Sequence, residues 1–259
     1  MQTMNDLLIF STQSQSISPM FSGPGGTWNF LDVHPRNSWI LLGKSSGDIY
    51  YYNYLTNQLT NHVSLDLKHE ITAVKFSNNG NLLAVGTKKG SVLILDSKSM
   101  ALKTKEPFCL SKAGIRDLVF SPEDVYLASS DQDRCVSVYM LKEDGWSVLG
   151  KSRCHSKPIN QLIFAYDQGK KDTHKFQPSF SKFKTVNKNT TKSIIYSHFL
   201  ETGGTMVISV GKDRKLVEFD LSKSSFSQGL ALKSRVSLEQ EATPLCIGKE
   251  IGYQSMCQY

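Results

Sequence analysis

The chain has 259 residues, of which 39% are hydrophobic and 20% are charged, as expected for a globular protein of one large or two small domains. Its five cysteines are odd in number and contain no C-x-x-C pair, which argues against a disulfide framework or a zinc site and favours a reducing compartment. The net charge of +7 permits acidic proteins, nucleic acids or anionic membranes as partners, while the sequence predicts neither a signal peptide nor a membrane span.

Residues 1–25 form an N-terminal segment with one short apolar run, Leu7 to Phe10, followed by a stretch rich in serine and glutamine. Two interpretations of this segment are open. It is either a mobile terminus or the outer strand of a repeat unit whose other strands are missing.

A repeated pattern dominates the rest of the chain. Each copy has an apolar opening, small residues, a polar turn, and then alternating apolar positions that end in a large side chain followed by one more residue. The four copies align without a gap at Ile40 to Asn53, Leu83 to Asp96, Leu127 to Met140, and Val207 to Asp220. The first three are spaced by 43 and 44 residues, a period typical of the blades of a β-propeller.

The first three blades are predicted at residues 26–66, 67–110 and 111–153. Their inner strands, ending at Val33, Phe76 and Phe120, keep one phase, because each of these residues lies seven positions before the next repeated stretch. We therefore expect Phe76 and Phe120 to be buried at equivalent positions.

The fourth blade is predicted at residues 154–240. Its inner strand ends at Phe164, which precedes Val207 by 43 residues rather than seven, so we place an insertion at residues 165–200. Its composition favours a long exposed loop, with room for a strand near residues 193–199. An outer strand is expected near residues 230–238. Residues 241–259 are predicted to begin a fifth blade and then to run into an atypical tail.

These units resemble WD repeats. The family's pattern has a histidine before the inner strand, an aspartate in the turn between the second and third strands, and Trp-Asp at the end of the third. His69 and His155 match the histidine, and Asp133 and Asp213 match the aspartate. The tryptophan position carries Tyr52, Leu95, Tyr139 and Phe219. The resemblance implies an all-β WD-repeat β-propeller in which the histidine hydrogen-bonds within its blade.

Within that family, residues 68–96, 155–159 and 211–220 resemble axonemal WD-repeat proteins, in particular those of the calmodulin- and spoke-associated complex of motile cilia and flagella. The resemblance implies a cytoplasmic, non-enzymatic scaffold at the base of the radial spokes. Its partners would be axonemal subunits, including a calmodulin-containing assembly. No cofactor, metal, membrane or small-molecule substrate is implied.

Two further motifs have a competing interpretation. Gly145 to Ser152 satisfies the phosphate-loop expression G-x-x-x-x-G-K-S, but no helical pattern follows it, so we interpret it as an outer strand. The insertion is rich in lysine and poor in arginine, which suits a solvated loop touching a protein better than a nucleic-acid platform. Its candidate partner contacts are Lys170, Lys171, Lys182 and Lys184.

The sequence therefore predicts an interaction scaffold without catalytic residues. The alternative is a basic WD-repeat subunit of an RNA–protein assembly that binds phosphates through the lysine-rich insertion. Four blades are fewer than the usual number of about seven, so we expect an incomplete arc of a larger propeller.

Overall fold

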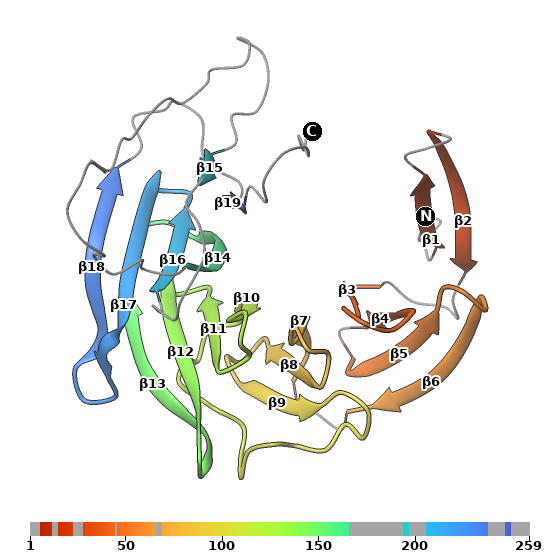
Figure 1. Cartoon of the computed structure of the whole chain (residues 1–259), viewed down its shortest axis with the longest axis horizontal. Helices are drawn as coiled ribbons and strands as arrows, with labels where there is room; N and C mark the ends of the chain where they lie inside the picture. The colour runs from red at the N-terminus through yellow and green to blue at the C-terminus, as the bar shows by residue number, and fades with distance from the viewer. Residues whose placement is uncertain are drawn as a thin grey trace, which may run out of the picture. The chain divides into compact units, whose positions relative to one another are not determined.

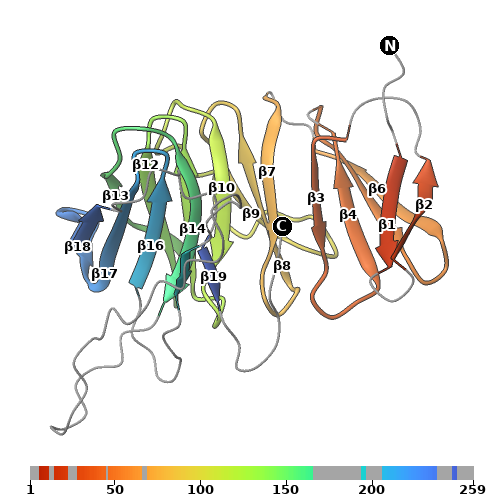
Figure 2. The same ribbon diagram turned by 90° about the horizontal axis from the view of Figure 1, so that it is seen from above.

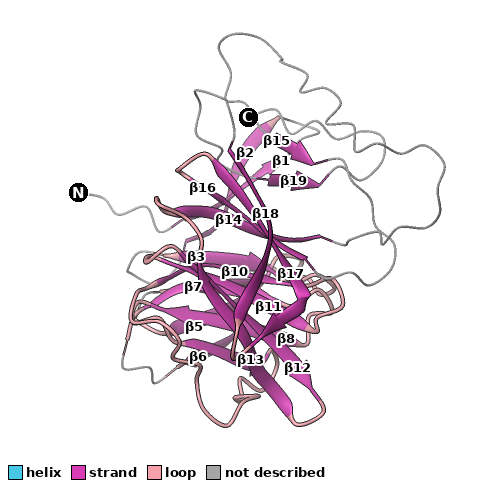
Figure 3. Cartoon of the chain, turned by 90° about the vertical axis from the view of Figure 1, so that its left-hand side faces the viewer, coloured by secondary structure: helices cyan, strands magenta, loops and turns pink. Residues whose placement is uncertain are grey.

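A computed structural model describes residues 6–11, 15–22, 28–44, 46–65, 69–165, 194–196, 206–237 and 247–249. Within these ranges every regular element is a β-strand (Figure 3), and no helix is present that could cross a membrane. The chain divides into two compact units, residues 1–124 and residues 125–259. The division falls inside the third predicted blade.

The first unit begins with a hairpin. Strands β1 (Asp6–Ser11) and β2 (Ser16–Ser22) pair antiparallel in a sheet of their own. The N-terminal segment thus contains two strands, where the sequence analysis allowed at most one. Strand β2 did not stand out in the sequence because it contains Pro19, a residue that weakens a strand assignment.

The first blade is a four-stranded antiparallel meander (Figure 1). It consists of β3 (Phe30–Val33), β4 (Trp39–Gly43), β5 (Asp48–Asn53) and β6 (Gln58–Ser64), hydrogen-bonded in that order. Val33 lies directly opposite Ile40 in the ladder. The spacing of seven residues seen in the sequence therefore corresponds to a hairpin, in which the turn between β3 and β4 brings the two residues opposite each other.

The second blade has three strands, β7 (Ile71–Phe76), β8 (Leu82–Thr87) and β9 (Val92–Asp96). Phe76 pairs with Leu83 as Val33 pairs with Ile40. At the outer position the chain forms two isolated bridges with β9, at Leu102 and Phe108. Strand β10 (Ile115–Phe120) ends the first unit and contacts β7 and β8. Phe76 and Phe120 are 4% and 5% exposed, which confirms the phase predicted for the inner strands.

The second unit holds two meanders. The first contains β11 (Tyr126–Asp131), β12 (Cys135–Lys142) and β13 (Gly145–Arg153). The second has the order β14 (Ile159–Ala165), β16 (Met206–Gly211), β17 (Lys215–Ser225) and β18 (Gly229–Ser237). Phe164 lies opposite Val207, so the ladder continues across the inserted residues in the register of the other blades.

A short parallel pair completes the second unit. Strand β15 (Ile194–Tyr196) comes from the insertion and pairs with β19 (Ile247–Lys249). The segment expected to open a fifth blade, Thr243 to Ile247, lies outside the described residues except for Ile247. That residue belongs to the parallel pair rather than to a meander of the blade type.

Antiparallel strands place the turns of each sheet at its two ends, as the view from above makes visible (Figure 2). The turn between second and third strands has the same backbone shape in all four blades. Its last residue has a positive φ of 105°, 82°, 67° and 59° at Gly47, Gly90, Arg134 and Arg214. These positions are seven residues after the start of each repeated stretch, so the repeat extends to backbone dihedrals.

Candidate functional site

The histidine of the fourth blade is part of a buried hydrogen-bonded chain. His155 lies before β14, with its Nδ1 2.9 Å from Asp213 Oδ1 and its Nε2 2.9 Å from Ser209 Oγ. The backbone N–H of Ser156 donates to the other carboxylate oxygen of Asp213 at 2.8 Å. These hydrogen bonds join the segment before β14 to β16 and to the turn that follows β16.

Burial acts to raise the pKa of the Asp213 carboxyl group. Hydrogen bonds from the Ser156 N–H and from His155, together with the proximity of the His155 ring, more than offset burial, so the pKa lies below its ordinary value. The carboxylate is therefore ionised when it accepts these hydrogen bonds.

Ser209, His155 and Asp213 have the connectivity of a nucleophilic triad, in which a serine is activated by a histidine that an aspartate orients. A nucleophile must reach a substrate, however. Ser209 is 0% exposed, and its Oγ lies 3.5 Å from the Val217 carbonyl of the neighbouring strand. This arrangement can stabilise a blade, whereas acyl transfer would require access that the packing does not give.

His69 does not take the corresponding place in the second blade, and the structure corrects that expectation. The side chain is exposed. The reason is spacing, because His155 precedes its strand residue Ile159 by four positions whereas His69 precedes Ile71 by only two. The turn that such a histidine would reach also carries Lys89 in place of an aspartate.

The aspartate of the third-blade turn is also not placed like Asp213. Asp133 is exposed, and the buried carboxylate in this turn belongs to Asp131. Oδ1 of Asp131 accepts the Cys135 N–H at 2.9 Å, and Oδ2 lies 3.6 Å from Lys151 Nζ. Ser111, rather than a histidine, lies four residues before β10. The histidine that donates to Asp213 in the fourth blade therefore has no counterpart for Asp133.

The lysines predicted as partner contacts, Lys170, Lys171, Lys182 and Lys184, lie outside the described residues. Among the described cysteines, burial raises the pKa of the Cys135 thiol, and it raises that of Cys154 to about 12. Both thiols are therefore protonated and unreactive at neutral pH. No cluster of potential metal ligands occurs in the described part of the chain.

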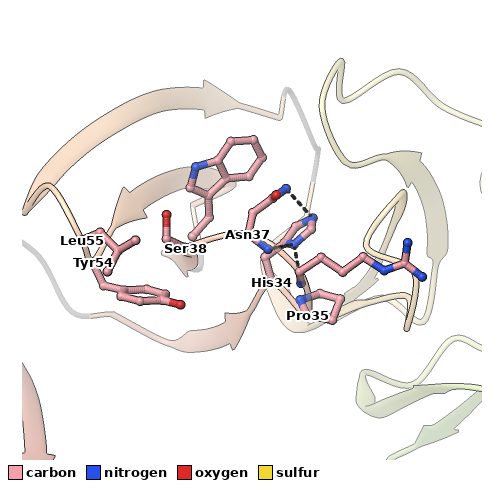
Figure 4. Close-up of a pocket in the computed structure, with 8 residues that line it drawn as sticks. His34, Pro35, Asn37, Ser38, Tyr54 and Leu55 are labelled. Atoms are coloured by element: carbon pink, nitrogen blue, oxygen red, sulfur yellow. Dashed lines mark hydrogen bonds between the residues drawn. The ribbon is translucent and has the colours of Figure 1, made fainter.

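A surface cleft lies at one end of the first blade (Figure 4). Its volume is ≈ 480 Å³. It is formed by the turn between β3 and β4 and the turn between β5 and β6. The lining residues are His34, Pro35, Arg36, Asn37, Ser38, Trp39, Tyr54 and Leu55. The sequence analysis did not identify this cleft.

His34 organises the wall of this cleft. Its Nδ1 accepts the backbone N–H groups of Arg36 and Asn37 at 3.1 and 3.0 Å, so Nε2 carries the proton and donates to the Gly80 carbonyl at 3.1 Å. Burial lowers the pKa of the ring, the bond to Gly80 opposes this effect, and Lys98 and Arg36 lower the pKa further. The neutral ring fixes the turn that presents Arg36.

The turn after β5, which forms the opposite wall of the cleft, is also fixed by a side chain that accepts backbone N–H groups. The side chain of Asn53 accepts the N–H groups of Leu55 and Thr56 at 2.9 and 3.2 Å, which closes the turn after β5. Leu55 is 75% exposed and Tyr54 37% exposed at the rim. Both side chains therefore present apolar surface at the rim of the cleft.

Two buried or half-buried carboxylates connect neighbouring strands beneath this end of the unit. Asp32 accepts the Phe76 N–H and the Lys75 ammonium, both at 2.7 Å. Asp124 accepts the N–H groups of Asn78 and Asn79, also at 2.7 Å. These bonds hold the turns of the first unit in place, and a single sequence gives no sign of them because each joins residues more than 40 positions apart.

Comparison with known proteins agrees with this architecture. Residues 31–108 match the family described as "Anaphase-promoting complex subunit 4 WD40 domain", and residues 106–139 match "WD domain, G-beta repeat". The fold and these matches identify WD40 repeats in an all-β chain, consistent with blades of part of a β-propeller.

More particularly, the chain is similar to cilia- and flagella-associated protein 251. It is 24% identical over 241 residues to the Pongo abelii protein, which covers 92% of this chain and 18% of that protein. The Tetrahymena thermophila protein is 22% identical over 244 residues, covering 83% of this chain and 22% of its own length. The chain thus spans about a fifth of these relatives. Mouse echinoderm microtubule-associated protein-like 2 is 36% identical over 142 residues, covering 53% of this chain and 21% of that protein.

Proposed function

We propose that the protein is a non-enzymatic interaction scaffold of the cilium or flagellum, attached to the axoneme at the base of the radial spokes. The observation that carries this proposal is the homology to cilia- and flagella-associated protein 251, which extends over 92% of the chain and therefore over all four blades. The partial match to a microtubule-associated protein supports a place on a microtubule-based structure.

The chemistry of the described side chains supports a scaffold rather than an enzyme. The Ser209–His155–Asp213 chain is buried, and the buried His34 ring binds backbone groups of its own turn and Gly80. In contrast, the exposed groups at the cleft are of the kind that bind proteins: aromatic and aliphatic side chains together with an arginine. Axonemal complex subunits, including a calmodulin-containing assembly, are the partners that this proposal implies.

The lysine-rich insertion motivates the rival proposal, in which the protein binds RNA phosphates. Purification of the tagged full chain from ciliated cells separates the two. A scaffold retains axonemal proteins after RNase treatment and at moderate salt. An RNA-binding subunit loses its partners with RNase, and its RNA affinity falls steeply as salt is raised. Recovery of ribonucleoprotein components that RNase releases would overturn the axonemal proposal.

A further inference from the structure

We propose that the cleft between the turns at residues 34–38 and 54–57 binds an acidic segment of a partner protein that carries an aliphatic side chain. The inference rests on the proposed function as an interaction scaffold and assigns a partner chemistry to one site of it. Three features of the first unit carry it: charge, apolar exposure and rigidity.

Arg36 is the charged side chain among the residues that line the cleft, and it is positive. The four turns of the first two blades that lie here, residues 34–38, 54–57, 77–81 and 97–100, contain only two charged side chains, Arg36 and Lys98. Neither has an ion-pair partner among the described residues. Both are near enough to lower the pKa of His34. An incoming carboxylate would therefore find two available cations on adjoining turns.

The Asp96 carboxylate at the end of β9 does not cancel this charge. Asp96 already accepts the N–H groups of Lys98 and Ser99 and lies 3.1 Å from the ammonium of Lys103. The hydrogen bonds from Ser99 and Lys103 hold the pKa of this carboxyl group well below its usual range. Asp96 is thus neutralised by its own surroundings, and the buried Asp124 carboxylate is bound by the N–H groups of Asn78 and Asn79, so Arg36 is the charged group that an incoming segment meets in the cleft.

The apolar part of the cleft favours a protein ligand over a free anion. Leu55 is 75% exposed and Tyr54 37% exposed, on the same turn, and half-buried Trp39 lines the cleft beside them. Figure 4 shows Leu55 and Tyr54 at one side of the cleft and His34 and Asn37 at the other. Arginine and aromatic residues are enriched where interfaces gain most of their binding energy. An aliphatic side chain can bury against Leu55 while a neighbouring carboxylate meets Arg36.

Rigidity makes the cleft a better site than a mobile loop would be. Arg36 is on a turn whose N–H groups bind His34, and Leu55 is on a turn whose N–H group binds Asn53. Beneath them, the Tyr51 hydroxyl donates to the Ser97 carbonyl at 2.7 Å, and the Ser97 hydroxyl donates to the Gly80 carbonyl at 2.6 Å. Little conformational entropy remains to be lost on binding.

Fluorescence anisotropy with labelled decapeptides tests the assignment on the full chain. The acidic probe alternates glutamate and glycine around one central leucine. A second probe replaces every glutamate with lysine, and a third replaces the leucine with glycine. Arg36→Glu and Leu55→Ser are the test variants, and Lys89→Glu is the matched control, since Lys89 is an exposed cation on the turn at the opposite end of the blade. All three side chains are exposed, so a thermal melt is expected to show unchanged folding.

We expect the acidic leucine probe to bind the unsubstituted chain, and more weakly as salt is raised. Arg36→Glu and Leu55→Ser should each weaken it by about tenfold, while Lys89→Glu stays within about twofold. Absence of binding, equal binding of the lysine probe, or an equal loss with Lys89→Glu would overturn the assignment. If the chain fails this binding test but is still found on the axoneme, the cleft assignment is wrong and the scaffold proposal stands.

Discussion

Replacing Asp213 with alanine is the most informative single change in the second unit. The carboxylate accepts hydrogen bonds from His155 Nδ1 at 2.9 Å and from the Ser156 N–H at 2.8 Å. It also accepts the Lys215 N–H at 3.2 Å. The side chains of His155 and Asp213 are 0% and 3% exposed, so water cannot replace the lost carboxylate at the ring without opening the blade.

The magnitude follows from which donors are left without a partner. A buried donor that loses its acceptor costs about 1–3 kcal/mol, and hydrogen bonds to a charged group are worth about 1.5–3 kcal/mol. Ser156 is exposed and its N–H can bind water, so most of the cost comes from His155. We therefore expect Asp213→Ala to destabilise the chain by about 3 kcal/mol, which corresponds to a fall in melting temperature of about 6–12 °C.

Asp133→Ala is the matched control, because Asp133 holds the same turn position in the third blade but is exposed. Its effect should stay within about 0.5 kcal/mol. Urea denaturation followed by circular dichroism and differential scanning calorimetry measure both variants. Equal destabilisation by the two substitutions would refute the claim that the His155–Asp213 bond, rather than an aspartate in this turn, stabilises the blade.

Three further predictions concern the first unit, and the last of them has its control in the second unit. Phe76→Ala and Phe120→Ala should each lower the free energy of unfolding by about 3–5 kcal/mol in urea denaturation, since both rings are buried inner-strand side chains; values below about 1 kcal/mol would contradict their place in the core. Folding lowers the pKa of His34, so the ring stays neutral in the folded protein at a pH where the unfolded chain already binds a proton, below about pH 6.5. The free energy of unfolding should therefore fall as the pH is lowered from that value to the pKa of the folded protein. His34→Gln should flatten the stability profile there, and an unchanged slope would refute the assignment. Gly90→Ala should lower the free energy of unfolding by about 2 kcal/mol or more in thermal melts, because φ is 82° and the added Cβ would lie 2.5 Å from the Ser111 carbonyl oxygen. Gly145→Ala is the control: φ is 109° but nothing lies within 4 Å of the added Cβ, so only the backbone strain of about 1 kcal/mol is expected.

The ladder of each blade could be predicted from the sequence because it depends on local spacing. Seven residues separate Val33 from Ile40 and Phe76 from Leu83, and both pairs lie opposite each other. The same phase located Phe164 opposite Val207, although the two residues are 43 positions apart. Alternating apolar side chains mark which face of a strand is buried, and this information is present in a single sequence.

Features that depend on geometry beyond one strand could not be predicted. His69 matched a family position by residue type, but two missing residues before the strand leave it exposed. Asp32 and Asp124 bind backbone groups of segments more than 40 residues away, and nothing in the local pattern distinguishes them from solvated carboxylates. The cleft was missed for the same reason, since its two turns are each ordinary and only their proximity forms the site.

The central claim is that this WD40-repeat chain is attached to the axoneme, and fractionation of cilia tests it most directly. The tagged full chain is expressed in ciliated cells, the cilia are isolated, and the membrane is removed with detergent. We predict that the chain stays with the detergent-insoluble axonemes and that immunogold labelling repeats along the doublets at the bases of the radial spokes. A chain that is absent from cilia, or that leaves entirely with the detergent-soluble fraction, would contradict the account.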